Sequence, residues 1–159
     1  MTGHPTKAER KGDRELVVSR TIRGAARLVF EAWAKPELFQ RWWVPASAPI
    51  KLVSCAWDVR TGGKYRLVFD YQGQEVAFFG SFLEVTPPTR IVWTNEEGGP
   101  EAGAISTASF EDRGDGTTLV TMHDLYPSKE ALDAAIASGS TEGAPEQLAQ
   151  LDALVVSLA

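Results

Sequence analysis

Between residues 50 and 125 the chain is a series of short segments with alternating apolar and polar residues, separated by turns rich in glycine and proline. In one such segment Tyr65, Leu67 and Phe69 would share one face of a strand, because successive side chains in a strand point to opposite faces. The string DRGDG at residues 112–116 is typical of a hairpin turn between two further segments. This pattern predicts consecutive antiparallel strands joined by short turns.

Helices are predicted near both ends of this sheet. Residues 146–158 carry leucine and valine at helical spacing, which predicts an amphipathic C-terminal helix. Ser128 is a suitable N-cap for a helix over residues 129–137. Antiparallel strands followed by an amphipathic helix predict an α+β fold. The expected strands are residues 15–22, 50–58, 64–70, 75–85, 90–95, 104–111 and 117–125, and the expected early helices are residues 25–34 and 36–43.

The composition is that of an ordinary globular protein, with 43% hydrophobic and 23% charged residues in a chain of 159. We expect the polar residues 1–14 to form a disordered tail and residues 15–159 to form a single domain. The net charge of −5 argues against nucleic-acid binding, which usually needs a basic face. No membrane-spanning run or signal sequence is expected, and the single cysteine fits a cytoplasmic protein. With two histidines, we predict neither a metal site nor a cofactor.

A series of strings follows one another along the chain: VFEAW at 29–33, PEL at 36–38, RWW at 41–43, DVRTGG at 58–63, EVTPPTRIVW at 84–93 and GTTL at 116–119. In this order they resemble the family of activator of heat-shock-protein-90 ATPase homologue-like proteins, within the START-like (SRPBCC) superfamily. The resemblance covers residues 15–158. It implies a helix-grip fold, in which a seven-stranded antiparallel sheet wraps around a long C-terminal helix and two short helices follow the first strand. It also implies a cavity between sheet and helix that often holds an apolar small molecule.

Two features of this chain depart from the family pattern. Ala144 and Pro145 stand where a tryptophan is often found near the start of the last helix. Ser106, Ala108 and Thr121 occupy positions that are commonly bulky aliphatic residues. If these three side chains face inward, the resemblance implies a cavity that is larger or more polar than usual.

We predict a ligand-binding site formed by aromatic side chains together with a few small or polar ones. Alternation places Thr121 and His123 on the same face of the last strand as Leu119, which favours this face as the inner one. For each single aromatic residue, core packing is the alternative, and for His123 it is a hydrogen bond to a backbone carbonyl. The predicted site consists of Trp43, Trp57, Tyr65, Phe69, Phe78, Trp93, Ser106, Ala108, Thr121 and His123.

Three functions are compatible with these residues. We favour a protein that binds an apolar or aromatic small molecule without firm catalytic activity. The second is an enzyme of the cyclase or dehydratase type acting on a polyketide-like ligand, with His123 as general acid or base. The third is a chaperone-binding module in which an exposed Trp42 belongs to the contact patch. A monomer and a homodimer formed through an exposed sheet edge or an apolar patch both fit the sequence.

Two geometric arguments narrow these choices. Trp42 and Trp43 cannot both point inward from a helix, because neighbouring residues lie about 100° apart around its axis. One of them is therefore expected to cap the cavity mouth or to stay partly exposed. Likewise, His123 and Asp124 should point to opposite faces of one strand. This argues against a catalytic triad of Ser106, His123 and Asp124.

Overall fold

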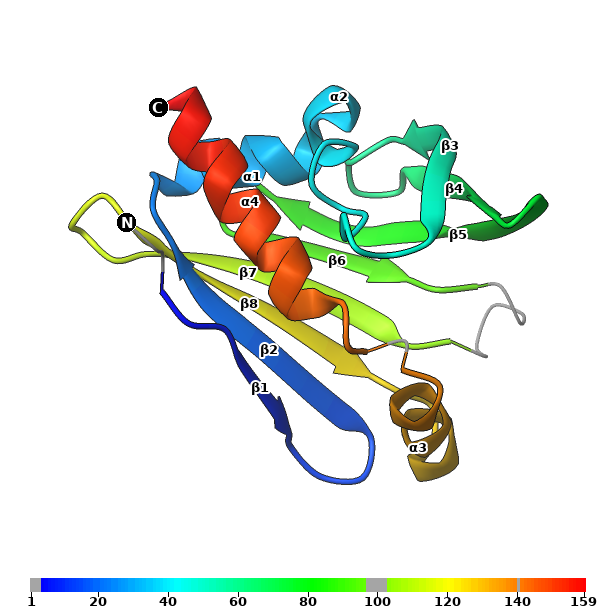
Figure 1. Cartoon of the computed structure of the whole chain (residues 1–159). Coiled ribbons are helices and arrows are strands. Elements are labelled where there is room, and N and C mark those ends of the chain that lie inside the picture. Colours follow the sequence, from blue (N-terminus) through cyan, green and yellow to red (C-terminus); the bar gives the residue numbers. More distant parts are fainter. Residues whose placement is uncertain (1–3, 97–102, 140) are drawn as a thin grey trace.

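In the computed structural model, which describes residues 4–96, 103–139 and 141–159, an antiparallel sheet curves around the C-terminal helix (Figure 1). Its eight strands, all from the described residues, follow the order β1-β2-β8-β7-β6-β5-β4-β3. The strands are β1 Lys7–Arg10, β2 Glu15–Ile22, β3 Ile50–Trp57, β4 Lys64–Tyr71, β5 Gln74–Thr86, β6 Arg90–Thr94, β7 Ile105–Asp112 and β8 Thr118–Leu125. The helices are α1 Ala26–Ala34, α2 Pro36–Phe39, α3 Lys129–Ala137 and α4 Ala144–Leu158.

This architecture confirms the predicted α+β helix-grip fold. The sheet has one strand more than the seven predicted, because Lys7–Arg10 pairs with Leu16–Ser19. The prediction of disorder is therefore wrong for these residues. All four β1 side chains are exposed, so hydrophobic periodicity gave no signal for this strand. Main-chain hydrogen bonds to the edge of β2 hold it instead, and such bonds do not depend on apolar side chains.

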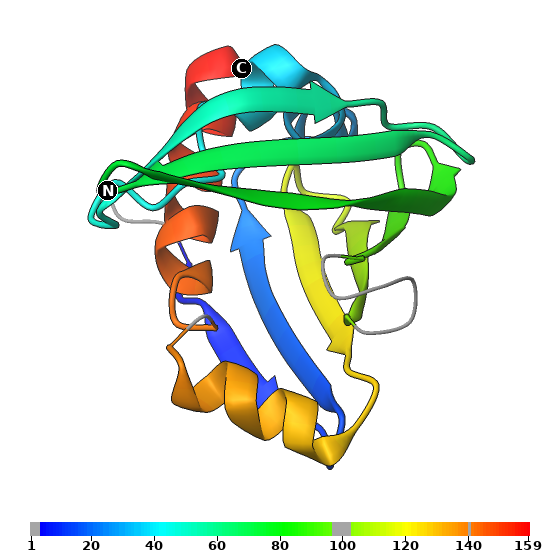
Figure 2. The same ribbon diagram turned by 90° about the vertical axis from the view of Figure 1, so that its right-hand side faces the viewer.

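The sheet is strongly twisted, so that β3, β4 and β5 cross the direction of β2 and β8 (Figure 2). The helix α4 lies against the concave side, with α1 and α2 at one end of the molecule and α3 at the other (Figures 1 and 2). As predicted, Ser128 caps α3, because its Oγ accepts a hydrogen bond of 3.0 Å from the backbone N–H of Ala131. No helix among the described residues is long and apolar enough to span a membrane.

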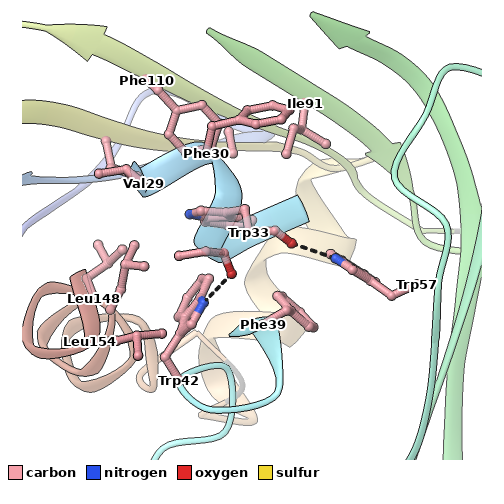
Figure 3. Close-up of a cluster of buried hydrophobic side chains, with 14 of the residues drawn as sticks. Val29, Phe30, Trp33, Phe39, Trp42, Trp57, Ile91, Phe110, Leu148 and Leu154 are labelled. Atoms are coloured by element: carbon pink, nitrogen blue, oxygen red, sulfur yellow. Dashed lines mark hydrogen bonds between the residues drawn. The ribbon is translucent and has the colours of Figure 1, made fainter. Parts of the chain in front are cut away.

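The interior beside α1 and α2 is filled by stacked aromatic rings (Figure 3). The Trp42 indole N–H donates to the carbonyl of Ala32 at 2.9 Å, and the Trp57 indole N–H donates to that of Trp33 at 2.6 Å. Phe39 stacks on Trp57, with ring centroids 3.9 Å apart. The indole N–H groups of Trp42 and Trp57 are satisfied, whereas the buried N–H of Trp33 has no hydrogen-bond partner among the described residues. The close ring contacts make this a packed core. We call this region the closed end.

A buried aspartate fixes α4 at the closed end. Asp152, which is 1% exposed, accepts hydrogen bonds from the Arg23 backbone N–H at 2.8 Å and from the Arg23 guanidinium Nη2 at 2.5 Å. The Arg20 guanidinium lies 3.7 Å from the same carboxylate. Because a buried charge is tolerated when it is paired and hydrogen-bonded, these contacts tie α4 to β2 and to the segment before α1.

Candidate ligand-binding cavity

Between the sheet and the N-terminal half of α4, the interior is hollow rather than packed. The cavity there has a volume of about 630 Å³, which lies within the range of roughly 300–1,000 Å³ typical of ligand pockets. Its walls come from strands β2 to β8, from the loop after α2, and from the α3–α4 segment. We call this region the hollow end, because it lies on the α3 side of the closed end.

Most of the predicted site residues line this cavity. Trp43, Trp57, Tyr65, Phe69, Phe78, Trp93 and Ser106 all do so. Ala108 faces inward as predicted, but it is fully buried in the core cluster and does not line the cavity. Trp42 and Trp43 also divide as predicted: Trp42 is fully buried, whereas Trp43 is partly exposed and forms part of the cavity wall. The sequence therefore located the aromatic wall of the site.

The prediction for the inner face of β8 is wrong. Met122 and Asp124 line the cavity and Val120 is fully buried, so Thr121 and His123 lie on the outer face. The Nε2 atom of His123 is 2.8 Å from Glu15 Oε1. The error arose because both faces of β8 carry apolar residues, so alternation grouped the side chains correctly without showing which group faces α4. Asp124 and His123 do point to opposite faces, as the argument against a triad required.

These positions also affect the two alternative functions. The enzyme hypothesis used His123 as an acid or base inside the cavity, and His123 is outside it. The chaperone hypothesis used an exposed Trp42, and Trp42 is 0% exposed. Each alternative hypothesis therefore loses the residue that motivated it.

A chain of hydrogen bonds forms one polar end of the cavity. Asn95 Nδ2 donates to the Ala104 carbonyl at 2.7 Å and to Ser106 Oγ at 3.2 Å. Ser106 Oγ in turn donates to Asp124 Oδ1 at 2.6 Å. The Tyr65 hydroxyl donates to the Thr94 carbonyl at 2.6 Å. Apart from this end, the wall is mostly aromatic and aliphatic, so the cavity is amphipathic.

Asp124 and Tyr126 are the ionisable groups whose pKa values this environment changes most clearly. Burial raises the pKa of the Asp124 carboxyl, and the Ser106 hydrogen bond and the charge of His123 oppose that rise only in part. Burial, together with the nearby Asp124 charge, raises the pKa of Tyr126 to about 12. Tyr126 is therefore a neutral phenol at physiological pH. The accessible surface that Asp124 retains opens into the cavity, since its side chain is part of the cavity wall.

The aromatic wall is held in place by side chains of α4. Gln147 Nε2 donates to the Trp43 carbonyl at 2.5 Å. Gln150 Nε2 donates to the carbonyls of Trp42 and Val44 at 2.8 and 2.9 Å. These bonds fix the loop after α2 against α4, so Trp43 is positioned at the cavity rather than free in solvent.

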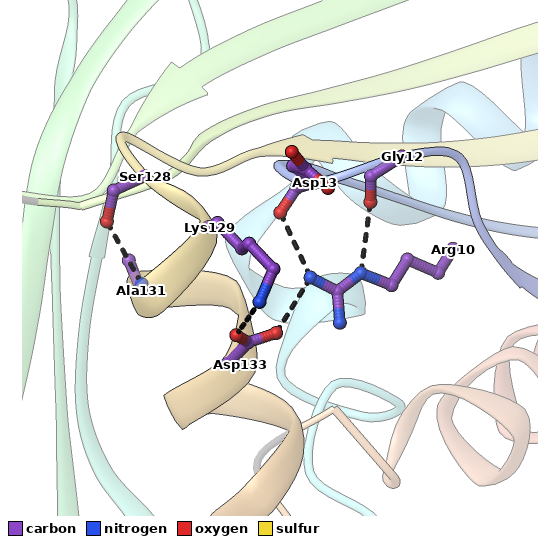
Figure 4. Close-up of polar contacts among 7 residues, drawn as sticks. All are labelled: Arg10, Gly12, Asp13, Ser128, Lys129, Ala131 and Asp133. Atoms are coloured by element: carbon purple, nitrogen blue, oxygen red, sulfur yellow. Dashed lines mark hydrogen bonds and ion pairs between the residues drawn. The ribbon is translucent and has the colours of Figure 1, made fainter.

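The helix α3, which contributes Ala135 to the cavity wall, is held by an ion-pair cluster on the surface (Figure 4). The Asp133 carboxylate lies 2.7 Å from the Arg10 guanidinium and 2.8 Å from Lys129 Nζ. Hydrogen bonds from Lys129 and then Arg10 keep the pKa of Asp133 below its usual range. Strand β1, which the sequence did not predict, thus contributes the Arg10 that holds α3 over the hollow end.

Several cavity residues were not predicted. Asn95, Met122, Asp124 and Tyr126 belong to the wall, and the pattern of the sequence carried no signal that they face inward. Asp124 lies on β8 and Tyr126 just after it, so the omission of both followed from the incorrect choice of the inner face of this strand. Within residues 4–96, 103–139 and 141–159, no group of three or more histidine, cysteine or acidic side chains forms a candidate metal site.

Comparisons with known proteins agree with this architecture. Residues 24–156 match the family model described as Activator of Hsp90 ATPase homolog 1-like protein. A crystal structure of a Rhodobacter sphaeroides protein superposes with a TM-score of 0.85 at 20% identity, covering 97% of this chain and 99% of that chain. A Nitrosomonas europaea protein gives 0.81 at 25% identity, with 94% and 98% covered. An AHSA1-like protein from Aeromonas hydrophila gives 0.67 at 18% identity, with 89% and 93% covered. Among curated proteins, none matches significantly.

Proposed function

This chain belongs to the family of Activator of Hsp90 ATPase homolog 1-like proteins, and from that family's fold and the hollow end we propose that it binds an apolar or aromatic small molecule. The observation that carries the proposal is the cavity of about 630 Å³ with aromatic walls and one polar end. A packed core of this size would not leave such a space, because protein interiors are normally close-packed. Ligand pockets typically combine apolar walls with a few polar groups in the same way.

A thermal-shift screen tests the proposal. The panel holds fatty acids, sterols, flavonoids and aromatic polyketide mimics. A ligand present at about 100 times its Kd stabilises the folded protein by about 2.7 kcal/mol. For a chain of this length, that raises Tm by roughly 5–10 °C. Wild-type protein that shows no shift with any member of the panel would count against the proposal.

A matched pair of variants shows whether a shift comes from the cavity. Met122→Trp enlarges a side chain that lines the cavity, and Thr121→Trp places the same bulky ring on the opposite face of the same strand. We expect Met122→Trp to lose the ligand-induced shift and Thr121→Trp to keep it. Equal shifts in both variants would place the bound molecule elsewhere and contradict the proposal.

A further inference from the structure

We infer that the ligand of this cavity carries a cationic amine, which binds the carboxylate of Asp124. The inference rests on the proposed function and names the chemical class of its ligand. It follows from three independent features of the hollow end: the direction of the hydrogen bonds, the distribution of charge, and the placement of the aromatic wall relative to Asp124.

The hydrogen-bond chain ends on an acceptor. An amide nitrogen has two N–H groups, and Asn95 uses them on the Ala104 carbonyl and on Ser106 Oγ. The single O–H of Ser106 is used on Asp124 Oδ1. The donors of this chain are thus consumed within the protein, and the Asp124 carboxylate offers its remaining lone pairs to the cavity. A ligand group that binds the Asp124 carboxylate must therefore supply a donor.

The charge at this end is negative and has no counter-charge inside the cavity. Asp124 is the only Asp, Glu, Lys or Arg among the described residues that line it. His123, the basic side chain next to Asp124 in sequence, belongs to the outer face of β8, where its Nε2 atom contacts Glu15. Burial raises the pKa of the Asp124 carboxyl, as expected where desolvation outweighs the neighbouring favourable contacts. An ammonium group would remove this cost, whereas a ligand carboxylate would increase it by repulsion.

The sheet register brings an aromatic ring into the same row as Asp124. Trp93, Ser106 and Asp124 occupy directly opposed positions on the adjacent strands β6, β7 and β8, and all three line the cavity. Tyr126, a neutral phenol, lies two residues beyond Asp124 in the same wall. Aromatic faces attract cations, and a carboxylate accepts charge-assisted hydrogen bonds from them. An amine at Asp124 would therefore place its hydrocarbon part along the aromatic wall.

Three probes with one hydrocarbon body test the inference: phenylbutylamine, phenylbutanol and phenylbutyric acid. Their Kd values are measured at neutral pH from the quenching of tryptophan fluorescence, since Trp43, Trp57 and Trp93 line the cavity. We expect the amine to bind about tenfold tighter than the alcohol, because both can donate a hydrogen bond to the Asp124 carboxylate but only the ammonium adds an opposite charge. The acid should bind most weakly.

The variant Asp124→Asn keeps the shape of the side chain and its acceptor oxygen for Ser106, but removes the charge. We expect it to reduce amine affinity far more than alcohol affinity, so that the preference for the amine disappears. The control Glu111→Gln removes an exposed charge from β7 and should keep the amine preference. The comparison of the three probes in wild-type protein does not depend on either variant.

The outcomes separate this inference from the proposed function. If the alcohol or the acid binds as tightly as the amine in wild-type protein, the cavity binds ligands but the amine inference is overturned. If Asp124→Asn keeps the amine preference, the assignment to Asp124 is overturned. If none of the three probes binds while a member of the thermal-shift panel does, the amine inference is overturned and the proposed function stands. If neither the probes nor the panel bind, both fail.

Discussion

The two ends of the space between the sheet and α4 each contain an aspartate, buried at the closed end and partly buried at the hollow end, and their surroundings differ. At the closed end, Asp152 is bonded to the backbone and guanidinium of Arg23 and approached by Arg20. At the hollow end, Asp124 accepts one hydrogen bond among the described residues, from Ser106, and faces a cavity. The same helix and sheet therefore hold one carboxylate that is satisfied by the protein and one that is not.

Strand β2 shows how one element serves both ends. Its inward residues Leu16 and Val18 line the cavity, while Ile22 is fully buried at the closed end and Arg20 approaches Asp152. The rings of Trp33, Phe39 and Trp42 fill the closed end. Asp152 therefore anchors α4 at the closed end, while the N-terminal half of the helix borders the cavity.

The largest expected effect is a difference in stability between variants of two neighbouring tryptophans. Trp42→Ala should lower the free energy of unfolding by about 3–5 kcal/mol, because it empties a fully buried site in the packed core. Trp43→Ala removes a partly exposed ring from the cavity wall, so its loss of stability should be clearly smaller and it should also weaken ligand binding. Urea unfolding of both variants measures this, and equal losses would show that the two ends are packed alike.

The next effect concerns the anchoring aspartate. Asp152→Asn keeps the side-chain volume but removes the charge that binds Arg23 and Arg20, so we expect a loss of about 1.5–3 kcal/mol in the free energy of unfolding. Urea unfolding is again the measurement. Glu31→Gln, at an exposed ion pair with Arg27, serves as the control and should change stability little. An unchanged midpoint for Asp152→Asn would contradict an anchoring role for this residue.

The corresponding change at the hollow end should have the opposite sign. Burial raises the pKa of Asp124 in the folded protein above its unfolded value. At pH values between these two pKa values, the folded state therefore binds more protons than the unfolded state. Stability is therefore lost as the pH rises from the unfolded pKa through the folded pKa, and it stays lost above it.

Asp124→Asn removes this cost, so the ligand-free variant should have a modestly higher Tm than wild type at neutral pH. The difference should vanish once the pH falls below the ordinary pKa of an aspartate. A melting series across pH measures both features. A lower Tm for the variant at neutral pH would mean that the protein itself satisfies the charged form of Asp124.

The smallest expected effect tests the corrected face of β8. His123→Phe should change the free energy of unfolding by less than about 0.5 kcal/mol, because a polar contact on the solvent-facing side of the sheet, such as that with Glu15, contributes little. It should also leave the Kd for phenylbutylamine unchanged. Fluorescence titration measures this Kd. A large loss of affinity would show that His123 contributes to ligand binding and would contradict its placement on the outer face.

Much of the fold was predictable because it follows from local pattern. Period-two alternation identified β4 with Tyr65, Leu67 and Phe69, and helical spacing identified α4. The aromatic wall was predictable for the same reason, since large apolar side chains are costly to expose. The cap of α3 by Ser128 depends only on neighbouring residues, and it too was predicted correctly.

What the tertiary structure decided was the choice between equivalent local patterns. Alternation separates Asp124 from His123, but only the contacts of β8 with β2, β7 and the space beneath α4 determine that Asp124 is inside. The strand at Lys7–Arg10 likewise exists through main-chain bonds to β2, which leave no trace in side-chain hydropathy. The sequence by itself therefore determined the elements and the aromatic interior, because these depend on local periodicity and burial. Strand pairing across the sheet decided which ionisable side chain of β8 faces the cavity, because the inner face of a strand is defined only by the elements packed against it.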